Sequence, residues 1–388
     1  MKKIISTLLA VMLLLGTVPA MAAKKAKGNT YSMPAEGTVL QNIEDRNITL
    51  PSDLSDNPVI SGESTVTGLP LAEGALYLPM LAQISNPVDK ETNIAGTGYR
   101  APWGGQYADI MYEGILTRKG ETRVTFLFSD SLADNQPLST GPIRSARIGH
   151  VLLREEWQGG LIFAGGPNKE DNNIKKMLKD FGATSAGVVF NLLDGKYTEY
   201  KQRVSGLAGP NNVDVNVAGI RTLIPSGTVA TPHPFLFADS SPYVDGYELA
   251  YSINLDWGHK HYISHLRYDE NENIYLRYTG DYPYISIAAC DDRSDENATQ
   301  MSFSNVIIQR IDYEYVNGNS IMPDMQSVGK GNADIFIAGR YIPGYWVRED
   351  VSSPTIFFDD QGNQLELTRG KTYIAHFPPE SLLTYQAN

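Results

Sequence analysis

The sequence has almost no cysteine, which limits the ways in which the fold can be stabilised. Cys290 is the only cysteine among 388 residues, so no disulfide bond can form within the chain. A chain of this length buries enough apolar surface to fold without one. No cysteine follows the apolar N-terminal segment either, so the sequence offers no site there for attachment of a lipid.

Long apolar runs are also scarce. The one prominent run extends from Ile4 to Leu15, after Lys2 and Lys3 and before Pro19-Ala20-Met21-Ala22. It is too short to span a bilayer, and its flanking residues are typical of a secretory signal with its cleavage site. The sequence therefore predicts a signal peptide over residues 1–22, a secreted or cell-envelope location, and no transmembrane segment in the mature chain.

Positive charge is in short supply, with 32 Lys and Arg residues against 44 Asp and Glu residues and a formal net charge of −12. This balance disfavours general binding to nucleic acid or to anionic lipid surfaces. Phosphate-loop and dinucleotide-binding fingerprints are missing, and no cofactor is predicted. The partners that we expect are a cell-wall component or another exported protein. A local cationic pocket remains compatible with an acidic chain.

The order of the residue patterns predicts an α+β fold in two units. Residues 23–75 are rich in Ser, Thr, Asn, Gly and Pro and predict a flexible tether. Residues 76–232 alternate between strand and helix patterns, which favours an α/β unit with a mixed sheet. Residues 243–381 contain short strands and turns, which favours a mainly β unit. Helices are expected over residues 108–113, 142–157 and 168–181. Strands are expected over residues 78–84, 122–128, 161–164, 262–267, 274–278, 305–315, 333–338, 355–358 and 372–377.

The most informative stretch runs from Ser139 to Arg147. It resembles a helix start, because Ser139 or Thr140 can cap a helix and proline suits the first helical turn. Arg144 and Arg147 are three residues apart, so they would project from nearly the same helix face. Free backbone N–H groups together with two guanidinium groups suit a carboxylate or a phosphate. We therefore include Arg144, Ser145 and Arg147 among the ligand-binding candidates.

Asp109 and Glu113 are candidates for acid or base catalysis. They are four residues apart, so on the helix expected over residues 108–113 they would lie side by side. Both would then be within reach of Arg123, Arg144 or Arg147. One carboxylate could then act as acid or base while the arginines hold an anionic group. The alternative is a structural ion-pair network that fastens the helix to the sheet.

The turn Gly165-Gly166-Pro167-Asn168 joins a predicted strand to a predicted helix. Its glycines would permit close approach of a ligand, and Asn168 could cap the helix that follows. The alternative is that these residues form only a tight turn between the strand and the helix. Gly165 and Gly166 are therefore ligand-binding candidates with an open alternative.

Three of the six histidines, His259, His261 and His265, lie within seven residues. On a single strand they would share one face, and with Asp256 they could hold a divalent metal. An exposed strand also presents polar residues at this spacing. We favour a solvated polar face and predict no metal site.

Several ordered motifs together resemble the YerB-like family over about residues 76–378. The motifs that carry the resemblance are Ala108-Asp109-Ile110-Met111-Tyr112-Glu113, Thr122-Arg123, Gly141-Pro142-Ile143-Arg144-Ser145-Ala146-Arg147, Ala164-Gly165-Gly166, Asn305-Val306-Ile307-Ile308-Gln309, Gly329-Lys330-Gly331, Tyr345-Trp346, Ser353-Pro354-Thr355 and Gly370-Lys371-Thr372. Members of this family are extracytoplasmic proteins of Gram-positive bacteria, often lipoproteins, with an uncharacterised two-part domain. The resemblance implies a location and an architecture, and no established activity.

The sequence departs from the family pattern at four places. The lipid-attachment cysteine is absent, Phe163 stands where a histidine is usual, and Arg118 or Lys119 falls where a glutamate is expected. Asn211 follows Gly209-Pro210 where another histidine is usual, and we include it among the ligand-binding candidates. If those groups are catalytic in relatives, this chain has lost the chemistry and kept the binding.

Three functional hypotheses follow from these features. The first is a cell-envelope protein that binds an anionic cell-wall ligand or partner through Arg123, Arg144 and Arg147. The second is a hydrolase of an envelope glycan or phosphodiester that uses Asp109 or Glu113. The third is a scaffold for other exported proteins.

Overall fold

The computed structural model describes residues 33, 36–40, 60, 62–86, 101–169, 172–259, 261–291, 298–315 and 323–387. The predicted signal peptide, residues 1–22, lies outside the described residues. No helix in the described ranges is long and apolar enough to cross a membrane.

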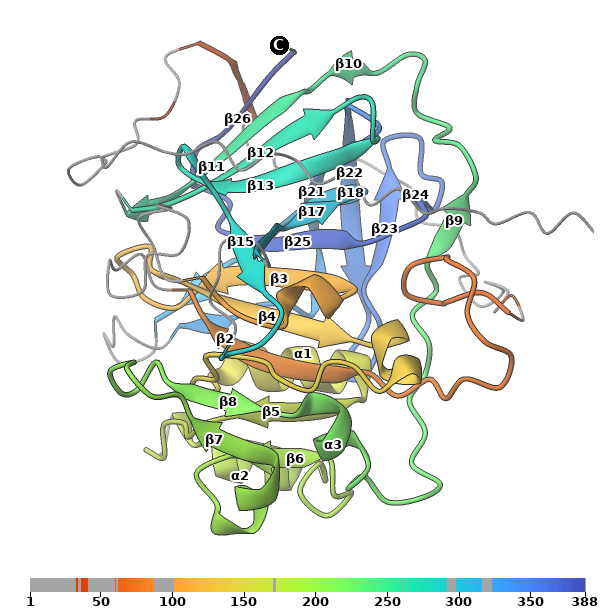
Figure 1. Cartoon of the computed structure of the whole chain (residues 1–388). Helices are drawn as coiled ribbons and strands as arrows, with labels where there is room; N and C mark the ends of the chain where they lie inside the picture. Colours follow the sequence, from red (N-terminus) through yellow and green to blue (C-terminus); the bar gives the residue numbers. More distant parts are fainter. Residues whose placement is uncertain are drawn as a thin grey trace, which may run out of the picture.

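The larger sheet of the described structure has eleven strands and combines both halves of the chain (Figure 1). Its strand order is β10-β22-β21-β18-β25-β3-β4-β2-β5-β6, and β23 pairs with β22. The strands from the first half are β2 (Met80–Ser85), β3 (Ile110–Ile115), β4 (Thr122–Phe128), β5 (Gly160–Phe163) and β6 (Val189–Asn191). Those from the second half are β10 (Glu248–Leu249), β18 (Asn305–Arg310), β21 (Gly329–Ile337), β22 (Arg340–Arg348), β23 (Ile356–Asp359) and β25 (Thr372–Phe377). The halves join where β25 runs parallel to β3, with Thr372 opposite Ile110.

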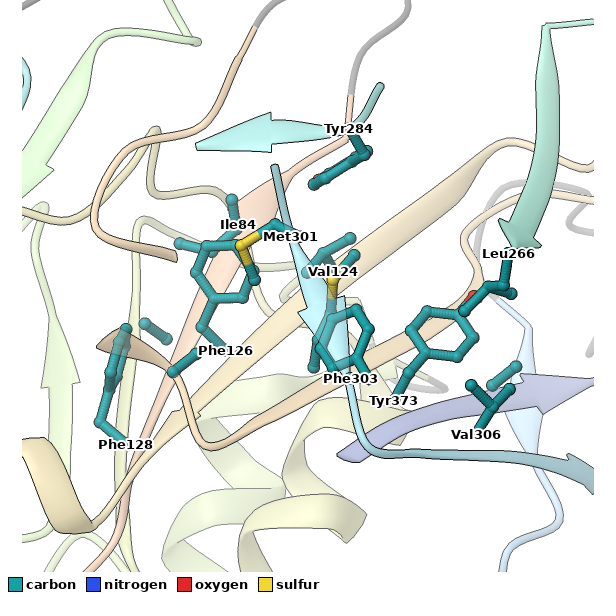
Figure 2. Packing of buried hydrophobic residues seen from close by; sticks show 14 of the residues in the cluster. Ile84, Val124, Phe126, Phe128, Leu266, Tyr284, Met301, Phe303, Val306 and Tyr373 are labelled. Carbon is teal, nitrogen blue, oxygen red and sulfur yellow. The ribbon is translucent and has the colours of Figure 1, made fainter. Parts of the chain in front are cut away.

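A second sheet of seven strands packs on one face of the larger sheet. Its strands are β1 (Thr38–Leu40), β11 (Ser252–His259), β12 (Tyr262–Asp269), β13 (Ile274–Thr279), β14 (Tyr282–Pro283), β17 (Ser302–Phe303) and β26 (Leu383–Gln386). Its inner residues, such as Leu266, share one apolar core with Phe126 of β4, Val306 of β18 and Tyr373 of β25 (Figure 2). All four are buried, so the two sheets share an apolar interface here.

Helices α1 (Ile148–Trp157) and α2 (Ile174–Asp180) contribute to the core on the opposite face of the larger sheet. Val151, Leu153 and Trp157 of α1 pack in one cluster with Ile110 of β3 and Ile307 of β18. Helix α3 (Val217–Arg221) belongs to the core on the first face. Four short strand pairs complete the described fold: β7 (Lys201–Arg203) with β8 (Val213–Val215), β9 (Leu236–Ala238) with β24 (Glu366–Thr368), β15 (Ile285–Ile287) with β16 (Ala298–Gln300), and β19 (Tyr313–Glu314) with β20 (Asp324–Met325).

The predicted α+β fold class is confirmed, and so are the strands expected over residues 262–267 and 274–278, which pair as β12 and β13. The helix expected over residues 108–113 is wrong, because these residues lead into strand β3. Strand β3 lies in the interior of a sheet whose faces are both covered, so Met111 and Tyr112 are buried on opposite sides. The usual alternation of polar and apolar residues is therefore missing, and the pattern imitates a short helix.

The helix expected over residues 142–157 begins six residues later, at Ile148. Backbone hydrogen bonds hold the residues before it in an extended form: Ser85 donates to Pro142, and Ile143 donates to Val213. The helix expected over residues 168–181 is shorter as well, and its cap is Asn173 instead of Asn168. Before α1, tertiary hydrogen bonds therefore override a local helix pattern.

The end of the segment predicted as a flexible tether is packed against the fold. Val66 is buried in the core, and the hydroxyl groups of Ser64 and Thr67 donate to the carboxylate of Asp130 at 2.6 and 2.5 Å. Residues 62–75 therefore form part of the described fold.

Candidate functional site

The site centres on the N-terminus of α1 and the extended residues 139–147 before it, called here the arginine segment. Arg147 is the N-cap residue of α1, and its backbone N–H donates to Nδ1 of His150 at 3.0 Å. The N–H group of Gly149 makes no hydrogen bond within the described part of the chain. The start of α1 therefore presents an open backbone donor where the helix dipole is positive.

Arg123 of β4 lies behind the helix start and is only 4% exposed. Its Nη1 donates to the carbonyl oxygen of Ser145 at 3.0 Å, whereas its buried Nε has no partner among the described residues. The buried Nε of Arg147 is also without a partner there, and its Nη1 donates to the carbonyl oxygen of Ala146. Each of the two guanidinium groups thus keeps one buried donor without a partner among the described residues.

No carboxylate of the described residues lies within 4 Å of either guanidinium group. Burial, and then repulsion from Arg144 and Arg147, lowers the pKa of Arg123 well below its ordinary value. Burial and the charge of Arg144 likewise lower the pKa of Arg147. The cluster therefore carries excess positive charge that an anion would offset.

A pocket opens at this cluster, between the end of β3, the start of α1 and the β19–β20 hairpin. Its polar lining residues include Arg123, Arg147 and His150, together with His376 of β25. Its apolar lining residues include Ile115, Leu116, Leu153, Pro323 and Met325. The pocket lining thus combines cationic and apolar side chains.

The two histidines in the pocket are neutral at neutral pH. Burial lowers the pKa of His376 to about 4. Burial, and then the charges of Arg123 and Arg147, lowers the pKa of His150 well below its ordinary value. Since Nδ1 of His150 accepts the N–H of Arg147, its neutral ring carries the proton on Nε2 and offers a further donor.

The other predicted ligand residues support the arginine segment from behind. Arg144 donates to Oδ1 of Asn211 and does not line the pocket. The hydroxyl of Ser145 donates to the carbonyl oxygen of Ala164 at 3.0 Å, and the carbonyl of Gly165 accepts the N–H of Ala146. Arg144 and Arg147 both precede α1 and therefore do not share one helix face, contrary to the prediction from the sequence.

The glycine turn packs against protein instead of opening toward the pocket. Gly165 has φ +80°, a conformation that glycine adopts readily, and its N–H donates to Oδ1 of Asn191. A Cβ on Gly166 would lie 3.2 Å from Ile174, the first residue of α2. Of its two interpretations, the geometry favours the tight turn.

Glu113 is a buried hub of hydrogen bonds. Its Oε2 accepts from Nη2 of Arg277 at 2.8 Å, from the hydroxyl of Tyr373 at 2.7 Å and from that of Ser264 at 3.0 Å. Its Oε1 accepts from Thr122 at 2.7 Å and from Nδ2 of Asn86 at 3.1 Å. Five donors occupy the carboxylate, which favours the structural alternative, with Arg277 as the ion-pair partner instead of the predicted arginines.

Asp109 does not lie beside Glu113, because a strand separates their Cα atoms by about 13 Å, where one helical turn would bring them together. Its Oδ2 accepts the backbone N–H groups of Ser129 at 2.6 Å and Asp130 at 2.9 Å. Burial, and then the charge of Asp130, raises the pKa of Asp109 to about 7. The predicted pair of catalytic carboxylates is therefore not assembled.

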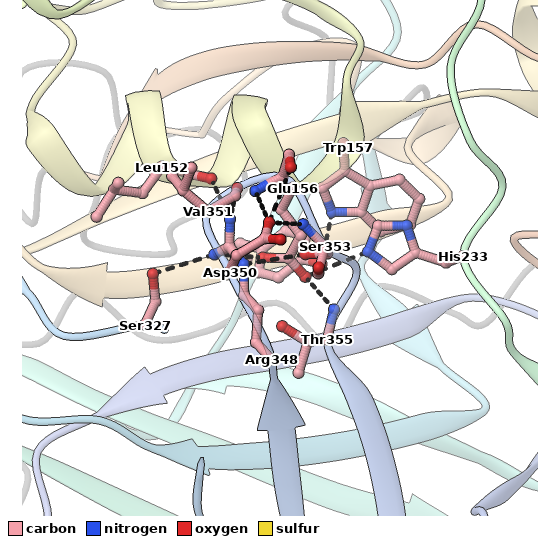
Figure 3. A network of polar contacts seen from close by, with 12 residues as sticks. Leu152, Glu156, Trp157, His233, Ser327, Arg348, Asp350, Val351, Ser353 and Thr355 are labelled. Carbon is pink, nitrogen blue, oxygen red and sulfur yellow. Dashed lines mark hydrogen bonds and ion pairs between the residues drawn. The ribbon is translucent and has the colours of Figure 1, made fainter. Parts of the chain in front are cut away.

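A polar network fixes the C-terminal half of α1 (Figure 3). Glu156 forms an ion pair with Arg348 of β22 at 3.1 Å and accepts from His233 and from the N–H of Thr355, both at 3.2 Å. Burial raises the pKa of Glu156, but Arg348 and the hydrogen bonds outweigh it and lower the pKa to about 2. Trp157 stacks on His233 with ring centres 3.6 Å apart. We call these five residues the α1 clamp.

The three neighbouring histidines do not share one strand. His259 ends β11 and His265 lies in β12, where it is 3% exposed and contacts the hydroxyl of Ser252 at 3.0 Å. The prediction that these histidines lie on a solvated polar face is therefore wrong for His265, whose side chain is buried. No group of three or more metal-ligating side chains gathers within the described ranges.

Sequence reasoning missed the part of the pocket that comes from distant residues. His376 and Met325 reach it from β25 and β20, and no local pattern links them to Arg123. His150 had a detectable signal, because it follows Arg147 by three residues, the spacing of a capping interaction.

Comparison with known proteins supports the resemblance found in the sequence. Residues 93–226 match the family model "Protein of unknown function (DUF3048) N-terminal domain", and residues 253–374 match its C-terminal counterpart. The crystal structure of the YerB protein from Bacillus subtilis is similar, with a TM-score of 0.62 and 21% identity over 81% of this chain and 96% of that chain. No curated protein matches. At this identity the structural likeness concerns the fold alone.

Proposed function

Because the chain belongs to the DUF3048 family of YerB-like proteins, whose function is unknown, we propose a function from the site itself: an exported cell-envelope protein that binds an anionic ligand between Arg123, Arg147 and the start of α1. The observation that carries the proposal is the buried guanidinium of Arg123, which has an unused Nε and no carboxylate of the described residues within 4 Å. Burying an unpaired charge is unfavourable by several kcal/mol, on the order of the stability of a whole domain. A bound anion would supply the missing counter-charge.

The polar environment supports an anion in preference to a cation or a neutral ligand. The donors come from two guanidinium groups, from the N–H of Gly149 and from His150. Charge-assisted hydrogen bonds of this kind are about twice as strong as neutral ones. Glu113 lines the pocket as well, but its carboxylate is already held by Arg277.

The export signal predicted over residues 1–22 supports a ligand in the cell envelope. The net charge of −12 disfavours a nucleic acid or an anionic membrane surface as the partner of the whole molecule. A small anionic group of a wall component fits a local cationic pocket in an acidic protein. The cell-wall ligand is therefore preferred over the exported-protein partner.

The hydrolase hypothesis has less support. Five donors fill the carboxylate of Glu113, and Asp109 lies at the other end of β3 beside Asp130. Neither carboxylate is placed to transfer a proton to a group held by Arg123 and Arg147. The scaffold hypothesis becomes the leading one if no anion binds.

Calorimetric titration of the chain without residues 1–22 tests the proposal. Inorganic phosphate, glycerol phosphate and acetate are the probes, and Arg123→Gln and Arg147→Gln are the variants. Lys179→Gln is the matched control, because it removes one positive charge from an exposed position on α2. We expect at least one anion to bind, with affinity lost in both arginine variants and kept in the control. Equal affinity in all four proteins, or no binding at all, would refute the site.

A further inference from the structure

We propose that the surface formed by α2, β7 and the 3₁₀ segment η5 (Gly195–Tyr200) docks onto an anionic polymer of the cell envelope. We call the described residues between positions 169 and 203 the basic end. In Figure 1, α2 and β7 lie at the opposite end of the fold from the second sheet. None of the residues of the basic end lines the pocket at the start of α1. The inference shares the predicted export with the proposed function and does not depend on the pocket.

Exposed positive charge is concentrated at the basic end. Its exposed basic residues are Lys169, Lys175, Lys176, Lys179, Lys196 and Arg203, and its exposed acidic residues are Asp180, Asp194 and Glu199. In the rest of the described chain the exposed basic residues are Arg118, Lys119, Arg267 and Lys330. Exposed acidic residues far outnumber them there, and include Glu270 and Glu272 in the β12–β13 turn. The basic end is therefore a positive surface on a molecule with a net charge of −12.

The ammonium groups of the basic end can meet a partner at little cost. No carboxylate of the described residues lies within 4 Å of Lys175, Lys179 or Lys196. Lys176 pairs with Asp180 at 2.5 Å, but both side chains are more than half exposed, so water and salt weaken the pair. An anion that approaches these lysines has no buried ion pair to break.

The arrangement of the cations favours a polymer over a small anion. Lys175 and Lys179 are one helical turn apart and share a face of α2. Lys196 comes from η5 and Arg203 from β7. Cations that are spread over three elements, with exposed side chains, suit a flexible chain with repeated negative charges.

The packing of α2 disfavours insertion into a membrane. Ile174 and Leu178 are 2% and 1% exposed and belong to the core, and Met177 is half-buried against it. A helix that lies in a membrane interface needs a free apolar face, and the core already occupies that of α2. The outward face of α2 therefore offers charge and no apolar stripe.

Fluorescence anisotropy of labelled long-chain polyphosphate, titrated with the chain without residues 1–22, tests this inference. The affinity should fall more than about tenfold between 50 and 200 mM salt, as expected when about four cations contact a polyanion. Lys175→Gln together with Lys179→Gln should lower the affinity at least about fivefold at low salt and flatten the salt dependence. Lys119→Gln together with Lys330→Gln is the matched control, because it removes the same charge from exposed positions outside the basic end. The control should bind like the wild type.

An equal loss of affinity in both double variants would assign binding to net charge and overturn the docking surface, as would no binding at low salt. Sedimentation with phosphatidylcholine vesicles that contain phosphatidylglycerol tests a lipid surface instead. Binding to these vesicles without binding to polyphosphate would overturn the polymer. The pocket fails separately: Arg123→Gln should leave polyphosphate binding unchanged, and Lys175→Gln with Lys179→Gln should leave the titration with inorganic phosphate unchanged.

Discussion

The buried arginines at the two ends of α1 differ in their partners. At the C-terminal end, Arg348 pairs with Glu156 and donates to the hydroxyl of Ser327 and to the carbonyl oxygens of Leu152 and Ser353. Near the N-terminal end, Arg123 is nearly as buried, but among the described residues it makes one hydrogen bond, to the carbonyl oxygen of Ser145 at 3.0 Å. A fully partnered buried charge supports the fold, whereas an unpartnered one is available to a ligand.

Arg277 shows that a buried donor without a partner does not by itself distinguish the pocket. Its Nε and Nη1 are also buried without partners in the described part of the chain, as is Nε of Arg123. Burial would lower the pKa of Arg277, but the carboxylate of Glu113 outweighs burial and raises it. The rings of Tyr284 and Tyr373 lie 5.1 and 5.7 Å from its guanidinium carbon. The missing counter-charge, rather than a missing hydrogen bond alone, therefore distinguishes the pocket.

The largest expected effect lies in the α1 clamp. Glu156→Gln keeps the shape of the side chain but leaves the charge of Arg348 buried and uncompensated, so we expect the free energy of unfolding to fall by about 3–5 kcal/mol. Urea denaturation measures it. Asp180→Asn is the control, because the exposed Lys176–Asp180 pair contributes less than about 0.5 kcal/mol. A loss as small as that of the control would contradict a structural role for the clamp.

Acid should weaken the fold through His376 and through Glu156 in different pH ranges. The pKa of His376 falls from 6.5 when unfolded to about 4 when folded, so its neutral form stabilises the fold less as the pH drops through this range. The pKa of Glu156 falls from 4.5 to about 2, so its contribution is lost only below pH 4.5. Denaturant midpoints measured in pH steps check this order. In His376→Gln the loss between pH 6.5 and 4, at most about 3 kcal/mol, should shrink; an unchanged slope would exclude His376 as its source.

A smaller effect of opposite sign is expected at the pocket. Arg123→Met removes an unpaired buried charge and keeps an apolar side chain, so the free energy of unfolding without ligand should stay unchanged or rise by up to about 2 kcal/mol. Thermal and urea unfolding of the ligand-free protein measure it. A loss of stability comparable to that of Glu156→Gln would mean that Arg123 is a structural residue like Arg348.

The smallest effect on stability is expected for Arg147→Gln. Arg147 is half-buried and caps α1 through its backbone N–H, which the substitution leaves in place. We expect a change within about 0.5 kcal/mol in the free energy of unfolding, together with about a tenfold loss of anion affinity. Unfolding and calorimetric titration of the same preparation separate the two effects. Unchanged affinity would remove Arg147 from the site.

The sequence predicts which arginines lie at the pocket better than it predicts the backbone that holds them. Arg123 and Arg147 come together as expected, although the helix that was to align Arg147 with Arg144 begins only at Ile148. Glu113 shows why the remainder was missed: its partner Arg277 is 164 residues away, and such a pairing leaves no local pattern. The apolar lining of the pocket is likewise formed by residues that only the sheet order brings together.

The most direct test of an anion site at Arg123 is the thermal midpoint of wild type and Arg123→Met with and without added inorganic phosphate. We expect phosphate to raise the midpoint of the wild type and to leave that of Arg123→Met unchanged, while the variant without ligand is at least as stable as the wild type. An equal rise in both proteins, or no rise in the wild type, would contradict the claim that the unpaired charge of Arg123 is held for an anion.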